Sequence, residues 1–119
     1  MQRVSEGKIE SMFIKSVSTL ATFSPDGMAK TTVARGDFLF AGLNSFEPGQ
    51  EHAPHAHHGQ DKLYVVLQGR GTVQVGDETE ILTPGDAAFA PSGIMHAIRN
   101  TGSDRLVVMA ILSPPPGGK

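Results

Sequence analysis

Closely spaced glycine and proline turns leave room only for short extended segments in this chain. Strong turn signals stand at residues 24–27, 83–86 and 91–93, and apolar runs such as 63–67 and 105–112 lie between such turns. Short strands separated by turns every roughly eight to twelve residues are typical of antiparallel sandwiches and barrels. The pattern therefore predicts an all-β domain.

The predicted strands divide the chain into three parts. Residues 1–37 are expected to form an N-terminal extension with a hairpin, in which 17–23 and 28–34 flank Ser24-Pro25-Asp26-Gly27, although residues 5–17 also show helical spacing. Residues 38–112 are expected to form the barrel, and the Pro- and Gly-rich tail 113–119 is expected to be flexible. The barrel strands are predicted at 38–46, 63–67, 71–75, 79–82, 87–90, 95–99 and 105–112.

Four of the five histidines fall between His52 and His58. His55 and His57 are two residues apart, so on an extended strand both imidazoles leave the same face, as a metal ion requires. His96 is the expected third ligand, because it lies in a second segment rich in turn residues. His52 and His58 are interpreted as surface residues.

Two segments resemble the paired motifs of the cupin superfamily over about residues 38–112. The family patterns are G-x5-H-x-H-x(3 or 4)-E-x6-G and G-x5-P-x-G-x2-H-x3-N, and the matching positions are Gly49, His55, His57, Gly69, Gly85, Pro91, Gly93, His96 and Asn100. The resemblance implies a double-stranded β-helix (jelly-roll) barrel. It also implies that His55, His57 and His96 bind a metal.

The chain departs from the family at Lys62, which stands where the first motif has its metal-binding glutamate. One alternative is that Lys62 turns away and Gln60, which has the same strand parity, supplies the fourth ligand; Asp61 would need a bulge at Gly59. A second is that Lys62 points inward and acts as an amine nucleophile or base. A third is that water completes a three-histidine site.

Tyr64 has the same strand parity as Lys62, so both side chains are predicted to line a substrate cavity. For Tyr64 a position in the core is an equal alternative.

Composition restricts the cofactor and the partners. The chain has no cysteine, so a metal would bind nitrogen and oxygen, which suits iron, manganese, nickel, zinc or copper. Ten basic and twelve acidic residues without a basic run argue against nucleic acid or an anionic membrane as a partner. No apolar stretch approaches the ~20 residues that span a bilayer, and the start lacks the order of a signal peptide, so a cytoplasmic location is expected.

Two functions remain open on these residues. The first is a small metal-binding cupin enzyme that acts on an unidentified small organic molecule, as a dioxygenase, isomerase or lyase. The alternative is a non-catalytic cupin that binds or senses a small ligand, with or without metal. A homodimer is expected in either case, because the apolar faces of residues 17–34 and of the barrel need a cover.

Overall fold

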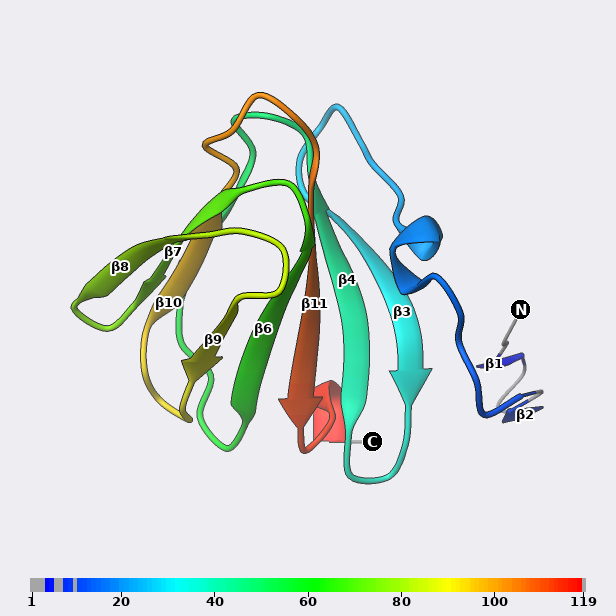
Figure 1. The fold of residues 1–119 in the computed structure, drawn as a ribbon. Helices are drawn as coiled ribbons and strands as arrows, with labels where there is room; N and C mark the ends of the chain where they lie inside the picture. Colours follow the sequence, from blue (N-terminus) through cyan, green and yellow to red (C-terminus); the bar gives the residue numbers. More distant parts are fainter. Residues whose placement is uncertain (1–3, 6–7, 10, 119) are drawn as a thin grey trace.

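The computed structural model describes residues 4–5, 8–9 and 11–118, and its main body is two antiparallel sheets packed face to face (Figure 1). In spatial order the five-stranded sheet contains β3 (Ala29–Arg35), β4 (Phe40–Phe46), β11 (Leu106–Ser113), β6 (Asp61–Gln68) and β9 (Ala87–Ala90). The four-stranded sheet contains β5 (Glu51–His55), β10 (His96–Arg99), β7 (Gly71–Val75) and β8 (Glu78–Leu82). Strands β1 (Val4–Ser5) and β2 (Lys8–Ile9) pair with each other, and η1 (Val17–Leu20) and η2 (Pro116–Gly118) are short 3-10 helices. The predicted all-β class is confirmed.

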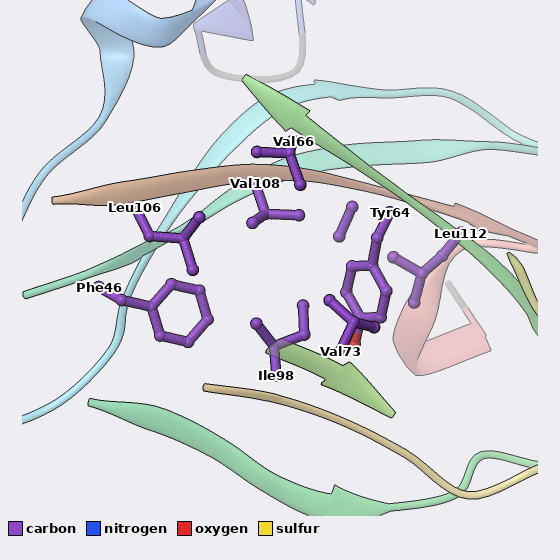
Figure 2. Close-up of a cluster of buried hydrophobic side chains, with 9 residues drawn as sticks. Phe46, Tyr64, Val66, Val73, Ile98, Leu106, Val108 and Leu112 are labelled. Carbon is purple, nitrogen blue, oxygen red and sulfur yellow. The ribbon is translucent and has the colours of Figure 1, made fainter. Parts of the chain in front are cut away.

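The main core lies between the two sheets. Figure 2 shows its side chains, which come from strands of both sheets and meet in the middle. They are Phe46, Tyr64, Val66, Val73, Ile98, Leu106, Val108, Ala110 and Leu112. The polar site residues described below lie next to this cluster, because the Tyr64 ring is 5.8 Å from that of His96 and Leu112 lines the same cavity as the other histidines.

The N-terminal segment covers the outer face of the five-stranded sheet. Val33, Leu43 and Val107 are buried on that face, and the side chains that pack on them include Val17 and Phe23. Strand β4 is therefore buried along nearly its whole length, because both of its faces are covered. The N-terminal segment of the same chain therefore covers much of the apolar sheet face that a second subunit was expected to cover. The homodimer stays a prediction.

Residues 17–23 differ from the expected hairpin strand. Val17–Leu20 form η1, and across the turn only an isolated bridge joins Ser24 to Gly27. Strand β3 pairs with β4 instead. The apolar side chains of residues 17–23 pack against the sheet, which they reach without an extended ladder. Part of the helical alternative for residues 5–17 lies outside the described residues.

Strand β6 alternates between the two faces of its sheet. Lys62, Tyr64 and Val66 are buried between the sheets, whereas Leu63 is 37% exposed on the outside. The apolar run 63–67 predicted a strand buried on both faces, and this is wrong for Leu63. Its neighbour β9 forms the sheet edge, where Phe89 pairs with Leu63 and is also exposed.

The C-terminal residues contact the barrel. The Gln60 side-chain amide donates to the Pro114 carbonyl (3.0 Å), and the Arg35 guanidinium donates to the Pro116 carbonyl (3.4 Å). Pro115 is buried. The flexibility of 113–119 stays a prediction. Among the described residues, no helix has the length and apolar character needed to cross a membrane.

Candidate metal centre

Strands β5 and β10 bring the two histidine-bearing segments together. His96 lies opposite His55 in the antiparallel pairing, although 40 residues separate them along the chain. His57 follows just beyond the end of β5, where its carbonyl accepts a hydrogen bond from the Gly93 N–H at 2.8 Å. The pairing of the strands, and the turn that precedes β10, therefore place all three predicted histidines at one end of the sandwich.

The three imidazoles have the mutual geometry of a metal site. One ring nitrogen of each of His55, His57 and His96 lies within 4.8 Å of those of the other two. The ring centroids of His55 and His96 are 4.2 Å apart, and those of His55 and His57 are 4.9 Å apart. The predicted convergence of these three side chains is present in the structure.

Backbone carbonyls orient two of these rings. Nδ1 of His55 lies 2.7 Å from the Ala53 carbonyl, and Nδ1 of His96 lies 3.0 Å from the Ile94 carbonyl. A proton on Nδ1 donates to each carbonyl and leaves a lone pair on Nε2. Both Nε2 atoms are buried without a hydrogen-bond partner among the described residues. Unpartnered, buried nitrogen acceptors that converge on one point fit a divalent metal ion.

Burial favours the neutral form that metal binding requires. It lowers the pKa of His96 to about 4, against the opposing effect of the Ile94 carbonyl, and the charge of Lys62 lowers it further. The pKa values of His55 and His57 are also lowered, first by burial. These imidazoles are therefore neutral at pH 7, and protons compete with a metal only in more acidic solution than for ordinary histidines.

His52 is a fourth imidazole in the cluster, which sequence reasoning had placed on the surface. Its ring centroid lies 4.1 Å from that of His55, and its buried Nδ1 has no partner among the described residues. Burial, followed by the charges of His55 and Lys62, lowers its pKa to about 3. The cause is a bulge: β5 has two residues between His52 and His55, whereas β10 has one residue between the paired His96 and Ile98, so both imidazoles face inward. His58 is exposed, as expected.

Lys62 points into the space between the sheets. Its side chain is 6% exposed, and its ammonium group donates a hydrogen bond to the Tyr64 hydroxyl at 3.3 Å. Burial lowers the pKa of Lys62 to about 8, and the charge of Lys30 lowers it further. Of the three alternatives for this residue, the outward position is not the one observed. Tyr64 is fully buried in the main core, and burial raises the pKa of its hydroxyl.

Gln60 and Asp61 have different surroundings. Gln60 is half-buried beside the histidines and uses its amide N–H on Pro114, which leaves its amide oxygen as the group that a metal would bind. Asp61 is exposed, and its carboxylate accepts the backbone N–H of Ser92 at 2.9 Å. The parity argument against Asp61 agrees with this position. Gln60 as the fourth ligand stays a prediction.

A cavity of about 550 Å³ opens beside the histidines. Its polar end is lined by His52, His55, His57, Gln60, Lys62, Lys30 and Asn44, and its other residues are Phe40, Ala110, Leu112, Pro116 and Gly117. The carbon-rich wall and the few polar groups are typical of a site for a small organic ligand. A smaller hollow of about 260 Å³ beside β8 and β9 has no histidine in its lining.

Known proteins share sequence and fold with this chain. The cupin domain family matches residues 42–112. A protein of Thermus thermophilus, TT1209, superposes with a TM-score of 0.83 at 38% identity, over 87% of this chain and 98% of that one. KdgF from a Halomonas species superposes with a TM-score of 0.73 at 32% identity, over 77% of this chain and 83% of that one.

Curated relatives match a smaller region. The oxalate-binding protein of Thermotoga maritima is 32% identical over 74 residues, which are 62% of this chain and 60% of that protein. The chain spans a little over half the length of the first curated relatives it matches.

Proposed function

Because the chain belongs to the cupin family, we propose that it is a metal-dependent cupin that binds a small organic molecule in the cavity beside His55, His57 and His96. Its reaction would fall among those of dioxygenases, isomerases and lyases. The ion would be iron, manganese, nickel, zinc or copper, since the donor set consists of imidazole nitrogen with amide or water oxygen.

The observation that carries the proposal is the pair of buried, unpartnered Nε2 atoms of His55 and His96. A buried polar atom without a partner raises the free energy of the folded state, typically by about 1–3 kcal/mol. Two such atoms converge on one point together with His57. A bound ion would satisfy them, and the backbone carbonyls already hold both rings in the required orientation.

A bound divalent ion would act as a Lewis acid toward water or toward a chelating substrate. The residues of the chain would do the rest. Gln60 would complete the ligand set, Lys62 would place a proton donor or a positive charge within the cavity, and the wall formed by Phe40, Ala110 and Leu112 would exclude water. The Tyr64 hydroxyl fixes the position of the Lys62 ammonium group.

One observation favours a non-catalytic binding protein as the second candidate. Lys62 occupies the position of the family glutamate, and an ammonium group near a divalent ion weakens its binding. The name of the oxalate-binding protein of Thermotoga maritima is consistent with ligand binding in a relative. The two candidates share the cavity and differ in whether the ligand reacts.

Metal titration of the untagged, chelator-treated chain tests the proposal. We expect one Mn²⁺, Ni²⁺ or Zn²⁺ ion per chain, with a rise in melting temperature as the ion saturates the folded form. Binding should weaken as pH falls toward 4, because protonation then removes the lone pair of His96. A chain that binds none of these ions between pH 6 and 8 would contradict the metal proposal.

Lys62→Glu is expected to bind the metal about 100-fold more tightly, because a cation inside the cavity is replaced by a carboxylate that can bind the ion. Calorimetric titration of both proteins at pH 7 gives the ratio. Lys15→Glu makes the same charge change at an exposed site and should alter the affinity little. An equal or lower affinity in Lys62→Glu would mean that Lys62 supports the metal site.

A further inference from the structure

The cavity beside the histidines has a one-sided charge. Lys62 is buried in its wall and Lys30 stands exposed at its edge, and no acidic side chain lines it among the described residues. The two ammonium groups are close enough for the charge of Lys30 to lower the pKa of Lys62. Without a counter-ion, the cavity is an electropositive compartment.

The acidic side chains nearest the cavity interact with other groups outside it. Glu51 of β5 pairs with Arg99 at 3.6 Å, and Asp61 of β6 accepts the Ser92 N–H. Glu47, which follows β4, accepts two hydrogen bonds from the Arg105 guanidinium, each at 3.1 Å. The strands that carry His52, His55 and Lys62 therefore supply no carboxylate to the cavity in the described part of the chain.

Hydrogen-bond donors inside the cavity are also free. The Lys62 ammonium group has three N–H donors, and the structure gives it one acceptor, the Tyr64 hydroxyl. Asn44 is buried and lines the cavity, and its side-chain amide forms no hydrogen bond with a described residue. Free donors beside an unbalanced positive charge are the features that recognise an anion.

We propose that the cavity binds a small organic carboxylate, with Lys62 and Asn44 contacting the carboxylate oxygens and Lys30 attracting the anion at the cavity edge. This inference rests on the proposed function in placing the ligand in the same cavity. The apolar wall of Phe40, Ala110 and Leu112 suits the carbon skeleton of such a ligand. A carboxylate fits better than a phosphate, because no arginine side chain lines the described cavity, and the one helix that reaches it, η2, has only three residues and too few free N–H groups to hold a phosphate.

Calorimetric titration with malonate tests the inference, first on the chelator-treated chain and then on the metal-loaded chain. Malonamide has the same skeleton without charge, and we expect it to bind at least tenfold more weakly than malonate. Lys62→Met should weaken malonate binding about tenfold or more, and Lys30→Met about two- to fivefold because Lys30 is exposed. Lys15→Met removes an exposed lysine outside the cavity lining and should leave the affinity unchanged.

Metal affinity provides the second readout. Lys62→Met should bind metal at least as tightly as the unmodified chain, so a loss of malonate binding alone cannot come from unfolding. Equal binding of malonate and malonamide, tighter binding of inorganic phosphate, or full malonate affinity in Lys62→Met would overturn the inference. Malonate binding to a chain that takes no metal would contradict only the proposed metal function, and metal binding without malonate binding would contradict only the carboxylate inference.

Discussion

Replacing His55 and His57 together by alanine is expected to lower metal affinity by about 1,000-fold or more, since even loss of a group that merely orients a ligand costs about 10- to 100-fold. The double variant removes two of the three converging nitrogens and leaves His96 alone. A single imidazole holds a divalent ion no better than a surface histidine does. Calorimetry and elemental analysis of the untagged proteins measure the loss.

The matched control is His58→Ala, which removes an exposed imidazole next to the site. It should retain one ion per chain and nearly unchanged affinity. The fold should survive in the double variant, because His55 and His57 lie outside the buried core clusters. If the double variant still binds an ion stoichiometrically, the three-histidine centre is wrong and other residues, with His52 first among them, hold the metal.

Gly69→Ala is expected to destabilise the fold by about 4 kcal/mol, the sum of a left-handed backbone penalty and a steric clash. Gly69 follows β6 with φ of +82°, and a Cβ atom there would lie 2.2 Å from the Arg105 carbonyl oxygen. It would also lie 3.0 Å from the Leu106 Cα. These backbone atoms belong to the first residue of β11 and the residue just before it. Strand β11 is held between β4 and β6, so its backbone cannot rotate away as a side chain could.

Gly49→Ala separates the two contributions. Gly49 has a similar φ of +87°, but a Cβ atom there has no neighbour within 4 Å. Its substitution should cost only the backbone term, about 1–2 kcal/mol. Urea denaturation of the unmodified chain, Gly69→Ala and Gly49→Ala gives the three free energies of unfolding. An equal loss of unfolding free energy in Gly69→Ala and Gly49→Ala would contradict this prediction. It would mean that the backbone at Arg105 moves to make room for a Cβ atom at position 69.

Much of the sandwich was predictable from the sequence, because its turns depend on the residue types at the turns themselves. The hairpin of β7 and β8 closes at Gly76, where φ is +57°, and the flanking strands match the predicted 71–75 and 79–82 almost residue for residue. Asn100, the last position of the second motif, donates its side-chain amide to the carbonyls of Phe46 and Asp104. Such features depend on backbone conformations that few residue types adopt.

The parts that escaped prediction depend on partners far away in the chain. His52 turns inward because β5 bulges against β10, and parity counted along β5 alone assigns it to the other face. Residues 17–23 have the composition of a strand, but the outer face of β3 and β4 decides how they pack. Strand parity places Lys62 on the inner face of β6, as observed. Parity alone could not exclude that the lysine side chain turns away from a metal.

The alternation of β6 has a consequence for how such a cavity can change in evolution. Strand β6 pairs with β11 and β9 through its backbone, so the side chain at position 62 can change without changing the strand pairing. Lysine and glutamate codons differ by a single base. A pocket that attracts anions and one that carries the glutamate of the family motif therefore stand one point mutation apart on an unchanged scaffold.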